Sequence, residues 1–460
     1  MKLIYKVDDK PKFGPLLIFA LQQLLAIMTA TLVVPININT DADLVAKFGE
    51  GAIGMSPAAA LFGAGVGTLV YVLFTKKKSP VFLGSSFSFI ASMVAAFAGA
   101  TTVAVGFVGL IIGAVAAGLV YVVLAVFVRL LGVKWINKLM PAVVIGPTVS
   151  IIGLCLAGSA VSSLTSGGYD TTNTIVALIC GLTCLFVTIL CSVYGKKIGK
   201  LIPFVIGICA GYIFSFILTF IGMKAGCDEM MVLNFSPFAN LVAGGVTLKT
   251  FFAVPDFTFI KALGGFDGIT SSYIGTVLAA YVPVAFVVFA EHIADHKNIS
   301  SIIEQDLLTD PGLHRTLLGD GIGSMAGAFF GGCPNTTYGE SIGCVAITKN
   351  ASVWTIITAA AGAILISFCS PFVALVDSIP PCVMGGVCMA LYGFIAVSGL
   401  KMIQNVDLNK NKNLFVVSVI LIAGIGGLTV SFGKVQITSI ACALILGIIV
   451  NLLVKKSPEE

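Results

Sequence analysis

The fold is decided by Gly84-Ser-Ser-Phe-Ser-Phe in the first half of the chain and by its counterpart Asn335-Thr-Thr-Tyr-Gly-Glu in the second half. Each belongs to a stretch that is short of aliphatic residues and is opened by small hydroxyl side chains, so neither predicts a regular apolar helix. Counted along the chain, they fall in the third and the tenth predicted membrane spans, seven spans apart. Because seven is odd, the two segments enter the membrane from opposite sides. This predicts an inverted repeat, which is typical of secondary transporters.

A second pair of segments has the same separation. Met140-Pro-Ala-Val-Val-Ile-Gly-Pro resembles Ile379-Pro-Pro-Cys-Val-Met-Gly-Gly, in the predicted spans 5 and 12. Interrupted segments at corresponding places in the two halves point to the substrate site of a transporter. Extended backbone at membrane depth is tolerated only where it lines a cavity or is buried in protein. We therefore expect short extended strands to interrupt spans 3 and 10 at the site. The alternative is that the hydroxyl residues of these segments only allow close helix packing.

The composition is that of a polytopic membrane protein. Among 460 residues, 58% are hydrophobic and 10% are charged, whereas soluble domains are roughly 45–50% apolar and about 25% charged. This excludes a cytosolic enzyme, a secreted disulfide scaffold and a nucleic-acid binder. The 12 cysteines form no Cys-x-x-Cys pair and are interpreted as small packing residues. Since no nucleophile–base pair, phosphate loop or cofactor fingerprint is present, we expect no enzymatic activity, no cofactor and no metal site.

The predicted fold is all-α, with fourteen spans in a seven-plus-seven inverted repeat. The spans are 13–36, 57–74, 80–98, 103–128, 136–157, 174–193, 201–222, 273–296, 314–331, 336–348, 351–369, 381–398, 413–431 and 435–454. The first span follows lysines but lacks a small-residue cleavage site, so it is predicted to be a retained helix and not a signal peptide.

The charge distribution predicts the orientation in the membrane. If the N-terminus is cytoplasmic and the loops alternate, 21 of the 26 lysines and arginines fall on the cytoplasmic side. The other five are Lys47, Lys224, Lys249, Lys261 and Lys434. This asymmetry follows the positive-inside rule. We therefore expect a protein of the cytoplasmic (inner) membrane with both termini inside and one long extracellular connection at 223–272.

Three acidic residues lie inside predicted spans. Glu291 and Asp295 are four residues apart, on one face of a predicted helix. Glu340 follows the interruption at 335–339, where the positive end of a new helix would begin. Ionisable groups at membrane depth are costly, so each of these acids is a candidate functional residue. Asp295 has an alternative interpretation as a solvated residue at the cytoplasmic end of its helix.

Two buried carboxyl groups suit a flat, neutral heterocycle with alternating N–H and C=O groups, because a carboxyl accepts hydrogen bonds when ionised and also donates when protonated. Tyr338, Phe87 or Tyr392 would supply an aromatic face. An inorganic anion fits poorly, since no arginine lies in the spans that carry Glu291 and Glu340. Protonation of a carboxylate at membrane depth also offers a simple route to proton coupling, because burial disfavours the charged form.

The remaining titratable residues of the spans carry weaker predictions. His296 and His314 are expected to be solvated at the inner surface, and Asp320 and Asp377 to lie at helix ends. His292 follows Glu291 directly and therefore points to another face of the helix, where packing or contact with the lipid interface is as good an interpretation as proton transfer.

The chain resembles the nucleobase–ascorbate (nucleobase:cation symporter) family, and most closely its bacterial branch that transports uracil. The resemblance covers nearly the whole chain, and its most specific part is Pro334-Asn-Thr-Thr-Tyr-Gly-Glu-Ser-Ile-Gly-Cys-Val-Ala-Ile-Thr-Lys. Further matches are Gln22-Gln23-Leu-Leu-Ala-Ile-Met-Thr-Ala-Thr, Gly84-Ser-Ser-Phe-Ser-Phe-Ile, Ala290-Glu-His-Ile-Ala and Asp310-Pro-Gly-Leu-His-Arg.

The resemblance implies a core domain that binds the base and a gate domain that moves against it. The core would comprise 13–128 and 273–369, and the gate 129–222 and 370–454. Glu291 and Glu340 would bind the edge of uracil, together with backbone groups of Phe87 and Gly339. Ala30, Tyr338 and Tyr392 would wall the ring.

Three positions depart from the family pattern, namely Gln23, Asp295 and Ser341. The most informative is Asp295, which stands where a histidine coupled to the proton is usual. Aspartate can carry a proton, as Glu291 can, but its hard oxygens also suit sodium. The expected activity is proton-driven uracil import, with sodium coupling, another base (xanthine, hypoxanthine or thymine) or anion exchange as alternatives. The glycine-rich gate helices are candidates for a homodimer interface.

Overall fold

The computed structural model describes residues 3–132, 135, 140–196, 198–404, 406–432 and 435–454. This part of the chain is mostly helical and contains two small antiparallel sheets, each of two strands. Lys434 and the start of the predicted span 136–157 lie outside the described residues.

The first half of the chain runs from α1 to α11 and contains one short strand. Its elements are α1 (Phe13–Asn39), α2 (Ala42–Phe48), α3 (Pro57–Phe74), β1 (Leu83–Ser85), η1 (Phe87–Phe89), α4 (Ile90–Gly99), α5 (Val103–Leu131), α7 (Ala142–Cys155), α8 (Ala157–Leu164), α9 (Thr174–Tyr194), α10 (Ile198–Leu201) and α11 (Pro203–Ala225). Local signals set several helix starts. For example, the Ser56 side chain accepts a hydrogen bond from the backbone N–H of Ala59 and Pro57 opens α3, a favourable arrangement for a helix N-terminus.

Short helices connect the two halves. They are η2 (Asp228–Met230), α12 (Ser236–Val242), α13 (Leu248–Phe251), α14 (Thr258–Ala262) and η3 (Leu263–Gly268). The second half consists of α15 (Ser271–Ile303), η4 (Leu308–Gly312), α16 (Leu313–Gly331), β2 (Asn335–Thr337), α17 (Gly339–Thr348), α18 (Val353–Ile366), α19 (Ser370–Asp377), α20 (Pro381–Met402), α21 (Asn411–Ile425), β3 (Val430–Phe432), β4 (Val435–Ile437) and α22 (Ser439–Leu453).

The expectation of a polytopic membrane protein agrees with these helices. Among the described residues, eight helical stretches are long and apolar enough to cross a membrane: α1, α3, α5, α7 with α8, α9, α11, α15 and α20. Shorter apolar helices cover 87–99, 353–366, 411–425 and 439–453. Two helical stretches continue well beyond the predicted spans: α15 ends at Ile303 instead of residue 296, and α7 with α8 ends at Leu164 instead of residue 157.

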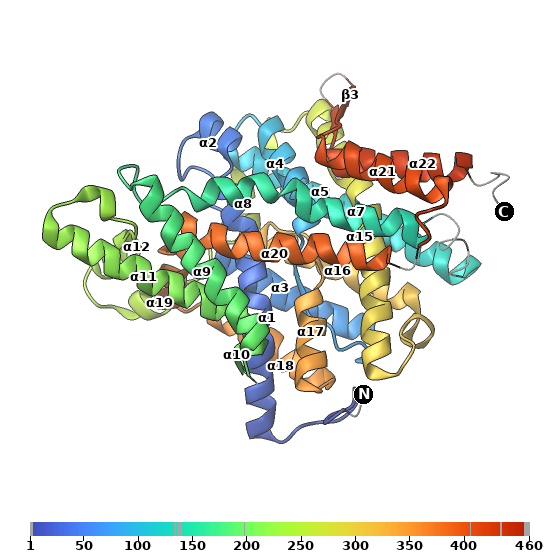
Figure 1. Cartoon of the computed structure of the whole chain (residues 1–460), viewed down its shortest axis with the longest axis horizontal. Helices are drawn as coiled ribbons and strands as arrows, with labels where there is room; N and C mark the ends of the chain where they lie inside the picture. Colours follow the sequence, from blue (N-terminus) through green and yellow to red (C-terminus); the bar gives the residue numbers. More distant parts are fainter. Residues whose placement is uncertain are drawn as a thin grey trace.

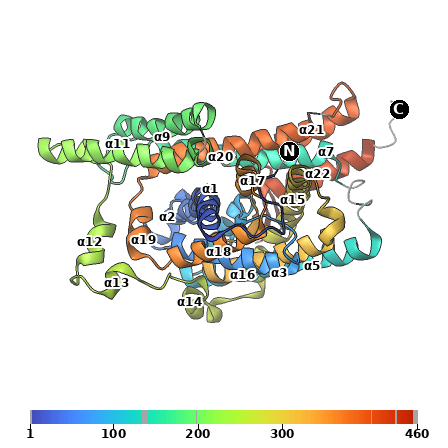
Figure 2. The same ribbon diagram turned by 90° about the horizontal axis from the view of Figure 1, so that it is seen from below.

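Helices from the two halves of the sequence lie side by side (Figure 1). α16 packs against α3 and α5, whereas α20 packs against α7, α8 and α9. Seen from below, α7, α9, α11, α20, α21 and α22 form one layer, and α1, α3, α5, α16 and α18 lie in a second layer (Figure 2). At the α3–α16 contact, a Cβ on Gly63 would lie 2.4 Å from the carbonyl oxygen of Gly327, so only glycine allows this approach.

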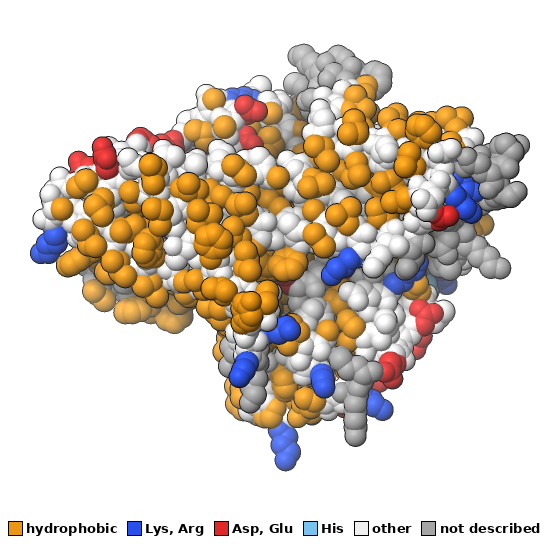
Figure 3. Space-filling view, viewed as in Figure 1, with side chains coloured by type: hydrophobic (Ala, Val, Ile, Leu, Met, Phe, Trp, Pro, Cys, Tyr) orange, Lys and Arg blue, Asp and Glu red, His pale blue; other side chains and the backbone are white. Residues whose placement is uncertain are grey.

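The outer surface carries a broad band of apolar side chains, which covers the α9 and α11 region in Figure 3. Exposed members of this band include Phe186 and Leu190 on α9, and Ile213, Phe216 and Phe220 on α11. Exposed apolar patches of this extent are unusual on soluble monomers. The band is therefore explained by contact with lipid.

Candidate substrate site

The two interrupted segments meet in a buried antiparallel pair of strands. β1 pairs with β2 so that Leu83 faces Thr337 and Ser85 faces Asn335. The ladder continues on both sides: Ser86 N–H donates to Pro334 C=O at 2.8 Å, and Tyr338 N–H donates to Phe82 C=O at 3.2 Å. The backbone N–H and C=O groups of each interrupted segment thus form hydrogen bonds with those of the other segment. This pairing makes extended structure possible away from water.

A helix begins directly after β2. α17 starts at Gly339, and Glu340 lies in its first turn. An added Cβ at Gly339 would meet no atom within 4 Å, so this backbone borders open space. A helix N-terminus next to open space presents N–H donors and a partial positive charge to a ligand.

Glu291 and Asp295 reach the strand pair from α15. Ser88, in η1 after β1, donates to Glu291 Oε2 at 3.3 Å, and Thr337 of β2 donates to Asp295 Oδ2 at 2.7 Å. The structure thus brings both acids to the two broken segments. Glu291, Asp295 and Glu340 are all partly exposed, and none of the described lysines or arginines is buried. The negative charge of ionised acids here would have to be balanced by protons or by a bound cation.

Aromatic side chains connect the site to the other layer of helices. The rings of Phe87 and Tyr392 meet edge to face with centroids 5.7 Å apart. The Tyr392 hydroxyl accepts a hydrogen bond from Asn37 of α1. Tyr392 of α20 thereby contacts both η1 and α1. Ala30 of α1 is buried, with 1% of its surface exposed.

Tyr338 lies against the backbone of β1. Its hydroxyl donates to Ser85 C=O at 2.7 Å, and a Cβ on Gly84 would come within 2.4 Å of its ring. Glycine at position 84 is therefore what lets the tyrosine ring cover the strand. The expectation that Tyr338 also walls a ligand stays a prediction.

Two of the positions that depart from the family pattern contact each other. The Ser341 hydroxyl of α17 accepts a hydrogen bond from the Gln23 side chain of α1 and another from Phe82 N–H at 3.0 Å. These bonds connect α1, α17 and the residue before β1 beside the site.

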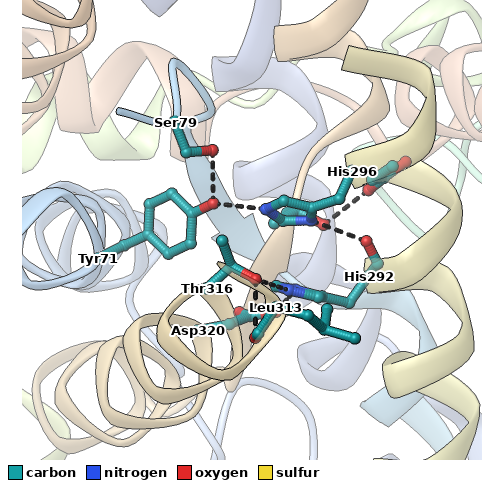
Figure 4. Close-up of polar contacts among 9 residues, drawn as sticks. Tyr71, Ser79, His292, His296, Leu313, Thr316 and Asp320 are labelled. Atoms are coloured by element: carbon teal, nitrogen blue, oxygen red, sulfur yellow. Dashed lines mark hydrogen bonds and ion pairs between the residues drawn. The ribbon is translucent and has the colours of Figure 1, made fainter. Parts of the chain in front are cut away.

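The expectations for His296 and Asp320 are wrong. His296 is fully buried and its Nε2 lies 2.7 Å from the Tyr71 hydroxyl. Asp320 lies inside α16 with 1% of its surface exposed, and its Oδ2 is 2.7 Å from His292 Nδ1. Figure 4 shows these groups between α3, α15 and α16. The sequence did indicate that Asp320 is buried, because the residue lies well within the predicted span 314–331. Asp377, by contrast, ends α19 as expected.

Within the ranges that the structure covers, no group of three or more His, Cys, Asp or Glu side chains is placed to hold a metal ion. The acids and histidines around α15 are instead engaged with hydroxyl groups and with one another.

The fold is similar to that of two solved anion transporters. The transmembrane domain of the cyanobacterial bicarbonate transporter BicA has a TM-score of 0.57 and 14% identity, with 97% of this chain and 100% of that chain covered. The murine anion transporter Slc26a9 in its inward-facing state has a TM-score of 0.61 and 12% identity, covering 97% and 69% of the two chains. At these identities the likeness concerns the fold alone.

The sequence is similar to that of curated transport proteins over its whole length. The uracil permease of Bacillus subtilis is 37% identical over 462 residues, covering 99% of this chain and 96% of the relative. The uracil permease of Bacillus caldolyticus is 36% identical, with 100% and 96% covered, and that of Escherichia coli K12 is 34% identical, with 99% and 95% covered. Since these relatives are named as permeases, the expectation that the chain is not an enzyme is confirmed.

A sequence profile of the permease family matches residues 14–432, which include both interrupted segments and all three site acids. The chain belongs to the nucleobase–ascorbate transporter family of permeases.

Proposed function

We propose that the chain imports uracil across the cytoplasmic membrane, driven by protons. The proposal rests on one observation above all: two acids of α15 are hydrogen-bonded to the broken segments, at Ser88 and at Thr337. The names of the full-length relatives give the substrate.

The proposed site lies between the β1–β2 pair, α15 and the start of α17. Glu291 and Glu340 would bind the polar edge of uracil, with backbone groups of Phe87 and Gly339 completing the hydrogen bonds. Ala30, Tyr338 and Tyr392 would wall the ring. The open space beside Gly339 and the partial exposure of the acids support this placement.

The proposed coupling proton is carried by Asp295 together with Glu291. Both groups are partly exposed, and none of the described lysines or arginines is buried to neutralise them. An ionised acid at this depth is costly, so binding of a proton from one side and its release to the other fits the chemistry of the site. Sodium bound by the same oxygens is the alternative that the transport assay distinguishes.

The proposed transport cycle is alternating access of two domains. The core (13–128 and 273–369) would hold the base, and the gate (129–222 and 370–454) would move against it, with 223–272 as the extracellular connection. In this proposal fourteen segments cross the membrane as two inverted sets of seven, spans 3 and 10 are interrupted by β1 and β2, and both termini are cytoplasmic. The antiparallel pairing of β1 with β2 supports the inverted relationship, since each strand comes from a different half of the chain.

Anion transport is the less favoured function in spite of the fold likeness to BicA and Slc26a9. Three partly exposed acids at the candidate site, without a buried lysine or arginine among the described residues, would repel a bound anion.

The test is uptake of radiolabelled uracil into proteoliposomes, with inward proton and sodium gradients imposed separately. Accumulation driven by the proton gradient alone is the expected result, and Glu291→Gln should abolish it because the site loses a charged acceptor. Stimulation by sodium alone would replace the proposed ion. If neither gradient drives uracil while sulfate or bicarbonate moves, the proposed substrate is wrong.

A further inference from the structure

The face of α15 next to the acids carries two histidines that the proposed transport cycle does not use. His292 and His296 are fully buried, and their rings stack with centroids 4.0 Å apart. Because they follow Glu291 and Asp295 by one position each, they project to a neighbouring face of the helix. They point into the protein between α3 and α16, as Figure 4 shows.

The hydrogen bonds of His292 fix where its protons lie. The Thr316 hydroxyl donates to Leu313 C=O at 3.0 Å, so its oxygen accepts from His292 Nε2, 3.0 Å away. Nε2 therefore carries a hydrogen. The other ring nitrogen, Nδ1, lies 2.7 Å from Asp320 Oδ2, and a contact this short between two acceptors requires one proton between them.

The surroundings decide which partner holds that proton. Asp320 Oδ1 is buried and has no hydrogen-bond partner among the described residues. An ionised carboxylate with one oxygen unpaired in an apolar interior is costly, whereas a neutral acid is tolerated. The titratable groups that face the pair are Tyr71 of α3, Tyr121 of α5, and Glu291, Asp295 and His296 of α15. Further acids nearby make another negative charge at Asp320 less favourable still.

A second anchor holds the same face of α15. His296 Nδ1 donates to His292 C=O at 2.8 Å. The Tyr71 hydroxyl, which can both donate and accept, lies 2.7 Å from His296 Nε2 and 2.7 Å from Ser79 Oγ. The two histidines thus connect α15 to α16 through Asp320 and to α3 through Tyr71.

We propose that Asp320 is a neutral carboxylic acid that donates its proton to His292 and acts as a positioning residue. Together with the Tyr71–His296 contact, this bond sets the rotation of α15 so that Glu291 and Asp295 face the β1–β2 pair. The proton on Asp320 stays in place and is not the one that is transported. The role of the positioned acids rests on the proposed function, but the protonation state of Asp320 does not.

The test compares two substitutions at one position in the full-length protein. Asp320→Asn keeps the size of the side chain and an N–H donor for His292 Nδ1, so we expect proton-driven uracil uptake within about threefold of wild type and an unchanged pH profile. Asp320→Ala leaves Nδ1 without its donor, and the maximal uptake rate should fall at least about tenfold. Asp377→Asn, at the exposed end of α19, is the matched control for removal of an acid.

A second measurement does not depend on uracil. The infrared spectrum of the wild-type protein should contain a carbonyl stretch of a protonated carboxyl group that is missing in Asp320→Asn. Absence of that difference would show an ion pair and overturn the proposal. The proposal would also be overturned if the Asp320→Asn variant exchanged uracil but no longer accumulated it, because the His292–Asp320 pair would then carry the transported proton.

If the Asp320→Ala variant does not insert into the membrane, the Asp320→Asn variant and the infrared band decide alone. Failure of the wild type to bind uracil would reject the proposed function and leave the infrared result standing.

Discussion

Thr337 of β2 donates a hydrogen bond of 2.7 Å to Asp295 Oδ2 of α15, although the two residues are 42 positions apart in the sequence. Each residue belongs to a different part of the candidate site, so this bond links the acid to the strand that precedes α17. A change of charge at Asp295 therefore directly changes a hydrogen bond made by β2. This is the connection that coupling between an ion and a substrate requires.

Asp295→Asn tests that connection. The amide oxygen can still accept from Thr337, but the side chain no longer takes up a proton. We expect uracil binding within about fivefold of wild type, together with loss of accumulation driven by a proton gradient. Binding by isothermal titration calorimetry and uptake into proteoliposomes measure the two properties. Thr337→Val is the control, because it removes the hydrogen bond and keeps the acid; it should slow uptake and preserve the response to pH. If Asp295→Asn keeps proton-driven accumulation, Asp295 is not the coupling group.

Glu340→Gln tests the edge of the binding site. Glu340 lies in the first turn of α17, next to open space at Gly339. The glutamine has nearly the same shape, so the helix start should persist while a charged acceptor is lost. Hydrogen bonds to charged groups contribute about 1.5–3 kcal/mol, so uracil affinity should fall roughly 10-fold to 100-fold. Equal expression and an unchanged melting temperature would show that the fold is intact, and unchanged affinity would remove Glu340 from the site.

Most of the helices could be predicted from the sequence because apolar runs of membrane length have few alternatives. The two short extended segments were also predictable, since both lack aliphatic residues and stand at corresponding positions of the predicted repeat. Glu291, Asp295 and Glu340 could be found as acids inside apolar runs, where burial is costly without a function.

The partners of the histidines could not be predicted in the same way. His296 contacts Tyr71, which is 225 positions away, and periodicity shows only that His292 and His296 share a helix face. Whether such a face meets water, lipid or another helix depends on long-range packing. Asp320 is a different case, because its place well within the predicted span 314–331 indicated burial.

Tyr392→Phe tests the contact between the two layers of helices. The substitution removes the hydroxyl that accepts from Asn37 and keeps the ring that meets Phe87 edge to face. If this hydrogen bond helps hold one state of the transport cycle, its loss of about 1 kcal/mol should change the maximal rate roughly threefold to tenfold. The Michaelis constant for uracil should change less, because the aromatic wall remains. Tyr392→Ala removes the ring as well and should raise the Michaelis constant. Identical kinetics for Tyr392→Phe and wild type would show that the hydrogen bond has no part in the cycle.

Gly339→Ala tests where the base lies. A Cβ at Gly339 would meet no atom within 4 Å, and the same holds for Gly343, one turn further along α17. Neither residue has a positive φ, so alanine should be accepted by the backbone at both positions without loss of thermal stability. If uracil lies against Gly339, the new methyl group occupies part of its space, and affinity should fall roughly 5-fold to 150-fold, as expected for overpacking by about 1–3 kcal/mol. Gly343→Ala adds the same methyl group outside the proposed contact and should leave uracil affinity unchanged. Equal affinities for the two variants would place the base elsewhere, because only a ligand that contacts residue 339 distinguishes these two otherwise similar glycines.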